Sequence, residues 1–197
     1  INKVQSNKKN QYDLPFHYFG QIISTSFTYD VPKTLSTLGD KFGYNHIWRE
    51  GSGTANAESI QFTWLDNRRF YTLTAATNKE DELILARVGA NDPEFNLRKD
   101  PSIIIRKKNT QNTVYASIIE SHGIYDPVKE VAENAYSNFK NIKVLSDDAN
   151  YTALKIQFKN DNEKTIILSN LNTDKNKTHT VTINGNTYSW EGFYYYK

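Results

Sequence analysis

Apolar and polar residues alternate along most of the chain, in short runs that are separated by turn-forming residues. In the run SIQFTWL, Ile60, Phe62 and Trp64 share one face of an extended chain, and Gln61 and Thr63 share the other. The same pattern recurs in QIISTSFTY, RRFYTLTAA, ELILARV, SIIIRKK, TVYASIIE, ALKIQF, KTIILS, HTVTIN and TYSWEGFYYY. Such alternation is typical of antiparallel strands with one buried face. It predicts about ten or more strands.

One segment, residues 126–139 (DPVKEVAENAYSNF), departs from this pattern. Asp126 has the residue type of a helix N-cap, and Pro127 suits the first helical position. Val128 and Val131 are spaced to share one face of a helix. We therefore expect one short helix here. A single short helix among so many strands predicts an all-β fold, an antiparallel β-sandwich.

The first residues, INKVQSNKKNQ, are polar, so we expect residues 1–11 to form a tail or connector and residues 12–197 to form one domain. The chain has 197 residues, of which 38% are hydrophobic, and this is enough for a buried core. It begins at Ile1 without a methionine, which we interpret as the mark of a processed portion of a longer protein.

Charge and cysteine content exclude several classes of function. The net charge is +2, with acids and bases well mixed, so we expect no nucleic-acid partner. No apolar run has the length of a membrane span, so we expect no membrane partner. Because the chain has no cysteine, disulfides and thiolate metal sites are excluded.

The four histidines give no metal motif. His17, His46, His122 and His179 lie far apart in the sequence, and none forms an H-x-H or H-E-x-x-H pair. We expect each to be packed in the core or exposed on the surface. Neither a phosphate-binding loop nor a dinucleotide fingerprint is present, so we expect no metal and no cofactor.

Residues 43–50 (GYNHIWRE) contain residue types that a polysaccharide lyase needs. Such an enzyme neutralises a uronate carboxylate, removes the adjacent proton and protonates the leaving oxygen, which Asn45, His46 and Tyr44 could do. A strand would instead place Asn45 and His46 on opposite faces, with Ile47 directed inward. The structural interpretation, a strand without catalytic residues, is the one we adopt.

Residues 89–98 (GANDPEFNLR) are longer and more polar than a tight hairpin connection requires. We interpret them as a structural corner, in which Asn91 and Asp92 turn the chain and Phe95 is directed inward. Arg98 would then pair with a neighbouring acid. Contact between Arg98 and a uronate is the alternative.

Together, five segments resemble the C-terminal β-sheet region of the heparinase II/III-like polysaccharide lyases, most closely the oligoalginate lyases of polysaccharide lyase family 17. The resemblance runs from Tyr12 to about Tyr194, and these segments carry it in order: YDLPFHYFGQII, GYNHIWRE, FTWLDNRRFYTLT, GANDPEFNLR and VYASIIESHGIYDP. It implies a large secreted or periplasmic enzyme that cleaves alginate by β-elimination. In this family an N-terminal α/α toroid carries the catalytic Asn, His and Tyr, and a structural zinc belongs to the upstream β region.

Because those parts lie outside this chain, the resemblance assigns it no catalytic residue and no metal ligand. We expect the chain to be inactive alone and to support the toroid and the upstream β region of its parent. The alternative is a carbohydrate-binding module for acidic polysaccharides, with Trp48, Arg49, Arg69 and Arg98 as contacts. A third hypothesis is a structural interaction domain whose sheet faces meet another domain or a second copy in a homodimer.

Overall fold

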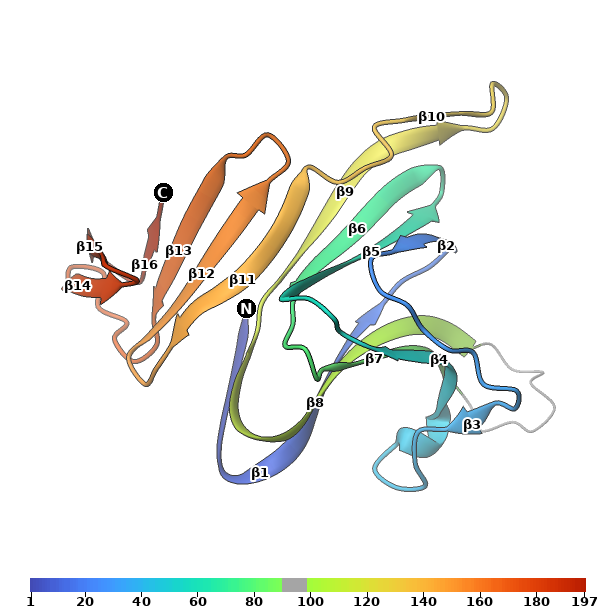
Figure 1. Ribbon diagram of the computed structural model, residues 1–197, viewed down its shortest axis with the longest axis horizontal. Helices are drawn as coiled ribbons and strands as arrows, with labels where there is room; N and C mark the ends of the chain where they lie inside the picture. The colour runs from blue at the N-terminus through green and yellow to red at the C-terminus, as the bar shows by residue number, and fades with distance from the viewer. Residues whose placement is uncertain (90–98) are drawn as a thin grey trace.

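The protein is folded almost entirely into antiparallel β-strands, as the sequence predicts. The computed structural model describes residues 1–89 and 99–197 (Figure 1). In this part of the chain, two five-stranded sheets pack face to face. Sheet A has the order β1 (Asn2–His17), β8 (Lys99–Tyr115), β7 (Glu82–Gly89), β4 (Ile47–Thr54) and β3 (Ser36–Thr37). Sheet B has the order β10 (Val131–Glu133), β9 (Ser117–Asp126), β6 (Arg69–Ala76), β5 (Ser59–Asp66) and β2 (Gln21–Thr25).

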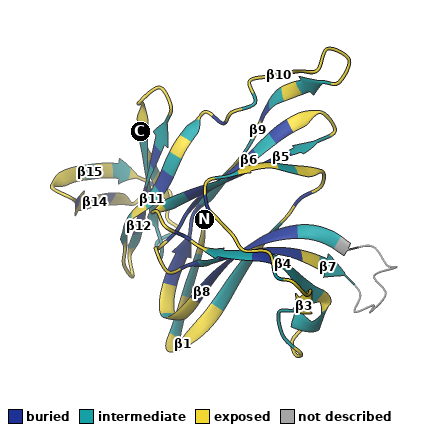
Figure 2. Ribbon diagram, turned by 45° about the vertical axis from the view of Figure 1, so that its right-hand side comes forward, coloured by how far each residue is buried: buried dark blue, intermediate teal, exposed yellow. Residues whose placement is uncertain are grey.

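The main core lies between these two sheets and follows the alternation of the sequence. Ile60, Phe62 and Trp64 of β5 are buried. They face side chains of sheet A such as Leu83 and Ile103. Figure 2 shows the buried residues concentrated in the middle strands, with exposed residues around the turn before β10.

A second pair of sheets forms the C-terminal part of the molecule, at the left of Figure 1. Sheet C has the order β11 (Phe139–Asp147), β12 (Tyr151–Phe158), β13 (Glu163–Ser169) and β16 (Tyr194–Tyr196). One face of sheet C packs on the main sandwich through a cluster that contains Ile142, Leu154, Val114 and Ala116. Its other face is covered by the hairpin of β14 (Thr178–Ile183) and β15 (Asn186–Glu191).

Residues 1–11 differ from the expected tail or connector. Most of them belong to β1, where Asn2 pairs with Tyr115 and Val4 pairs with Thr113 of β8. The Lys3 Nζ donates to Asp147 Oδ1 at 2.6 Å, so the first residues also contact sheet C. Backbone pairing to a sheet edge needs no apolar side chains, and polarity alone therefore did not reveal this strand.

The prediction of a helix over residues 126–139 is wrong. The chain instead turns after Asp126, and β10 pairs back onto β9 as a hairpin. The Asp126 carboxylate accepts hydrogen bonds from the backbone N–H groups of Val128 and Lys129, as a helix cap would, but no helix follows. Val128 is 90% exposed, so the apolar face that the spacing suggested is not buried.

The helical structure that the described residues contain is a single 3-10 turn at Tyr44–His46. No helix in the described ranges is both long and apolar enough to cross a membrane.

Candidate functional site: a charged cluster on sheet A

The predicted carbohydrate contacts that the structure describes, Trp48, Arg49 and Arg69, lie in two different sheets. Trp48 and Arg49 are neighbours in β4 of sheet A, where Trp48 pairs with Arg87 of β7. Arg69 lies exposed at the start of β6 in sheet B, opposite Asp66. Arg98 lies outside the described residues. Carbohydrate contact through these side chains therefore stays a prediction.

Arg49 belongs instead to a set of charged side chains on the outer face of sheet A. The alternation in β8 creates this face, because Ile103 and Ile105 point into the main core while Arg106 and Lys108 point away from it. The strand register brings the acids next to Arg106, which pairs with Asp13 of β1 on one side and with Glu82 of β7 on the other. We call Asp13, Arg49, Glu82, Arg106 and Lys108 the charged cluster.

Asp13 is held by two short hydrogen bonds, whereas Glu82 is held by ion pairs of different lengths. The Arg106 guanidinium donates from Nε to Asp13 Oδ1 at 2.9 Å and from Nη2 to Asp13 Oδ2 at 2.8 Å, a two-bond fork. The Glu82 carboxylate forms ion pairs with three cations: its oxygens lie 3.1 Å from Arg49 Nη1, 2.7 Å from Lys108 Nζ and 3.7 Å from Arg106 Nη1. Three cations therefore surround two carboxylates, an excess of one positive charge.

Tyr44 closes one side of the charged cluster. Its hydroxyl donates to Asp13 Oδ2 at 2.6 Å, and the Arg106 guanidinium carbon lies 5.7 Å from the centre of its ring. Burial raises the pKa of the Tyr44 phenol, and the hydrogen bond to Asp13 raises it further. The phenol therefore stays protonated at neutral pH and acts as a hydrogen-bond donor.

The ion pairs also change the pKa values of Glu82 and Arg106. Burial alone would raise the pKa of Glu82, but the hydrogen bond and charge of Lys108, with the charges of Arg106 and Arg49, lower it. Burial alone would lower the pKa of Arg106. The hydrogen bonds and charge of Asp13 outweigh the effect of burial, so the pKa of Arg106 is raised. Both groups are therefore charged at neutral pH.

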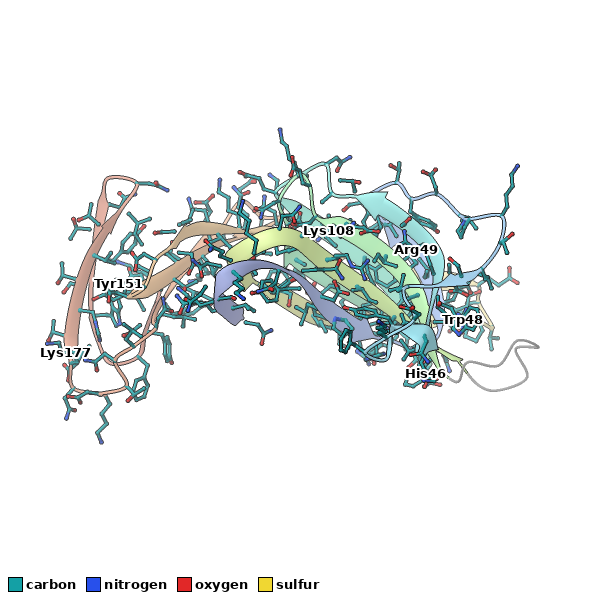
Figure 3. All side chains as sticks on the ribbon, turned by 90° about the horizontal axis from the view of Figure 1, so that it is seen from below. His46, Trp48, Arg49, Lys108, Tyr151 and Lys177 are labelled. Atoms are coloured by element: carbon teal, nitrogen blue, oxygen red, sulfur yellow. The ribbon has the colours of Figure 1, made fainter. Side chains whose placement is uncertain are left out.

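Beside the charged cluster is an open, polar hollow of about 480 Å³. Lys108 and Glu82 form one side of it, and Tyr29 and Asp30 form part of the other. The side chain of Lys108 is 53% exposed, so its ammonium group remains accessible to an anion from solution. Figure 3 shows Lys108 and Arg49 on the same part of the molecule, away from Tyr151 and Lys177.

This arrangement suits positioning better than proton transfer. Each carboxylate of the charged cluster is held by cations, and Tyr44 is bound to Asp13. A general base needs a free lone pair within reach of the proton that it removes. The neighbouring hollow does not favour an anion either, because Asp30, Glu80 and Glu82 line it together with the single cation Lys108.

Two residues of the GYNHIWRE segment, Tyr44 and Arg49, contact the charged cluster. Tyr44, Asn45 and His46 form the 3-10 turn, and the strand begins only at Ile47, so the expected strand alternation does not apply to Asn45 and His46. The exposed Asn45 Nδ2 and His46 Nε2 lie 3.0 Å apart and contact each other. Ile47 packs against Ile84, Ala86 and Ile104, in agreement with its predicted structural role.

The two buried histidines, His122 and His179, contact neighbouring polar groups and aromatic rings. The His122 Nε2 lies 2.8 Å from Thr72 Oγ1, and its Nδ1 lies 2.9 Å from the Asn134 carbonyl oxygen. His179 stacks on Trp190, with ring centres 5.1 Å apart. Among the residues that the structure describes, no three His, Asp or Glu side chains are grouped so that they could hold a metal ion.

Sequence reasoning missed most of the charged cluster. Asp13, Glu82, Arg106 and Lys108 come from three separated segments and belong to no local motif. One usable signal was the alternation at the end of SIIIRKK, which places Arg106 and Lys108 together on one face of a strand.

Comparisons with known proteins identify the relatives of this chain. A family model described as exo-oligoalginate lyase-like, C-terminal domain, matches residues 158–195. An exo-oligoalginate lyase of Saccharophagus degradans is 30% identical over 98% of the chain, and an alginate lyase of Stenotrophomonas maltophilia is 30% identical over 96%. The chain spans about a quarter, 26%, of the length of each relative.

Proposed function

This chain has the C-terminal domain of the family 17 alginate lyases, and from this premise we propose that it is a non-catalytic β-sandwich portion of an alginate lyase. The observation that carries the proposal is the extent of the similarity, which covers 98% of the chain but only 26% of the Saccharophagus degradans enzyme. A segment of this kind is one part of a larger enzyme.

The charged cluster supports the non-catalytic part of the proposal. β-Elimination on a uronate requires a base for the proton beside the carboxylate and preorganised donors for the charge that develops. Here Asp13 is held by Arg106 and by the Tyr44 hydroxyl, and Glu82 is held by three cations. These groups are already committed to one another.

In the parent enzyme, we place the N-terminal α/α toroid and the upstream β region beside this chain, with alginate as the substrate and a secreted or periplasmic location. The charged cluster would keep β1, β4, β7 and β8 rigid, and with them the residues around Tyr44. A rigid wall of this kind lets a neighbouring domain position its catalytic groups.

The test compares three proteins: this chain, the upstream part of the parent, and the full-length parent. Each is incubated with polymannuronate, and the ultraviolet absorbance of the unsaturated uronate product is followed. We expect product from the full-length parent, none from this chain, and reduced or no product from the upstream part. Product formed by this chain alone would contradict the non-catalytic role. Full activity of the upstream part alone would contradict the supporting role.

A further inference from the structure

The last strand and the turn before it expose aromatic side chains at the C-terminal end of the molecule. Phe193, Tyr194 and Tyr196 are 47%, 60% and 56% exposed. With Trp190 and Tyr195 they line an open hollow of about 560 Å³. We call Phe193, Tyr194 and Tyr196 the aromatic strip. It lies in β16 and beside it, on the other side of the molecule from β4 and β7 of the charged cluster (Figure 1).

A packed layer holds the aromatic strip in place. Tyr195 points to the other side of β16, where its ring centre lies 5.3 Å from that of Tyr188 and 6.2 Å from that of Trp190. β16 pairs with β13, so that Tyr194 is opposite Leu168 and Tyr196 is opposite Ile166. Because alternate residues of a strand share a face, Tyr194 and Tyr196 point the same way, about 7 Å apart.

Three lysines lie near the aromatic strip, and the side chain of one of them, Lys164, contacts it. The Lys164 Nζ lies 5.4 Å from the centre of the Tyr196 ring. The backbone of Gly192, beside Phe193, donates to the carbonyl oxygen of Lys177 at 3.0 Å. Lys197 follows Tyr196 directly and pairs with Thr165 of β13 through backbone hydrogen bonds.

The lysines near the strip differ in their ion pairing from Lys108, the lysine of the charged cluster. Within the described residues, neither Lys164 nor Lys177 nor Lys197 forms an ion pair with an acid, whereas Lys108 is bound to Glu82. Glu191 is the one acid among the residues that line the hollow. The strip therefore combines exposed rings with one nearby ammonium group, that of Lys164, for which the described residues provide no acidic partner.

We infer that the aromatic strip and Lys164 bind an acidic polysaccharide, separately from the charged cluster. The C–H faces of pyranose rings pack on the electron-rich faces of tyrosines, and the carboxylates of the sugar units meet the ammonium groups. Exposed rings with a neighbouring ammonium group on an open edge fit a linear polyanion better than an aliphatic protein surface. The choice of a uronate polymer rests on the proposed function.

The experiment measures the binding of polymannuronate by affinity electrophoresis, at low and at high salt, for this chain and for the full-length parent. The variants are the double substitution Tyr194→Ala with Tyr196→Ala, and Lys164→Gln. Tyr136→Ala is the matched control, because Tyr136 is 83% exposed and has Lys159 Nζ at 5.3 Å from its ring centre, but lies elsewhere. Circular dichroism of each variant confirms its fold.

We expect the unsubstituted chain to bind, with an affinity that falls as salt is added. The double substitution should weaken binding by about tenfold or more, Lys164→Gln by about threefold, and Tyr136→Ala not at all. Absence of binding by the unsubstituted chain, or equal binding by the double variant when it is folded, would overturn the inference. The inference would also be overturned if a protein partner of the parent bound to the aromatic strip and polymannuronate did not displace it.

The same preparations separate this inference from the proposed function. If the double variant of the full-length parent loses binding but still cleaves short uronate oligosaccharides at the unsubstituted rate, the strip is a second site and the inference stands. If binding is absent while cleavage follows the three-protein test, the inference fails and the proposed function survives. If this chain binds polymannuronate and the full-length parent cleaves none, the inference stands and the alginate assignment fails.

Discussion

Arg106 connects three strands of sheet A through a single side chain. It lies in β8, forms its two-bond fork with Asp13 of β1 and reaches Glu82 of β7. The Arg106 side chain is only 6% exposed, so water contributes little to its solvation. A buried pair of this kind gives modest net stability, but the loss of one partner leaves a charge that nothing nearby replaces.

We predict that Asp13→Asn lowers the free energy of unfolding by about 3 kcal/mol, because Arg106 loses its fork and keeps only the longer contact with Glu82. Urea denaturation followed by tryptophan fluorescence measures this change. Arg87→Ala is the control, since the Arg87–Glu50 pair is exposed and should contribute less than about 1 kcal/mol. Equal losses in the two variants would show that burial of the pair has no energetic consequence.

The lowered pKa of Glu82 predicts a loss of stability in acid. A carboxylate whose pKa is lowered by folding stabilises the protein above its unfolded value, and this contribution disappears as the pH falls through the folded value. Glu120 behaves in the same way, because hydrogen bonds from Ser137 and Asn138 outweigh the effect of burial and lower its pKa. We expect the free energy of unfolding to decrease as the pH falls below the ordinary glutamate value of 4.5.

Thermal unfolding across this pH range tests the prediction. Glu82→Gln should be less stable than the unsubstituted chain at neutral pH, because Lys108, Arg49 and Arg106 lose their shared carboxylate. Its stability should then change less between neutral and acidic pH, since one of the glutamates with a lowered pKa is gone. A Glu82→Gln variant with an unchanged dependence on pH would contradict the assignment.

At the scale of single elements, alternation alone was enough to predict the strands of the core. β5 and β6 read as strands because their alternate residues are apolar and meet one core. Residues 126–139 misled the prediction because Val128 and Val131 fit a helical spacing, whereas Asp126 and Pro127 suit a tight turn equally well. The choice between helix and hairpin was made by pairing with β9, which the local sequence does not contain.

The charged cluster was hidden from the sequence for a related reason. Asp13 and Arg106 are separated by 93 residues, and only the register between β1 and β8 brings them together. Arg49 reaches Glu82 after an irregularity in the pairing of β4 with β7, between Arg49 and Gly51. Register shifts of this kind re-aim side chains and have no simple sequence signature.

An apolar junction joins the main sandwich to the C-terminal part of the molecule. Ile142 of β11 is buried in the cluster that sheet C shares with the main sandwich, together with Val114 at the end of β8 and Ala116 between β8 and β9. Across this junction, the C-terminal part, with the aromatic strip at its far edge, is fixed relative to the charged cluster. Under the two proposals made above, the polymer site and the supporting surface would therefore have fixed relative positions in the parent enzyme.

We predict that Ile142→Ala lowers the free energy of unfolding by about 2–5 kcal/mol and separates the unfolding of the two parts, because the cavity lies where they meet. In a Trp190→Phe background, tryptophan fluorescence reports Trp48 and Trp64 of the main sandwich, while circular dichroism reports all the strands. The two urea transitions should coincide with Ile142 present and diverge in Ile142→Ala.

Val144→Ala is the control, because Val144 lies two residues along the same face of β11 but is exposed. It should lower the free energy of unfolding by less than about 1 kcal/mol. Coincident transitions in Ile142→Ala would mean that the two parts are coupled through contacts other than this cluster.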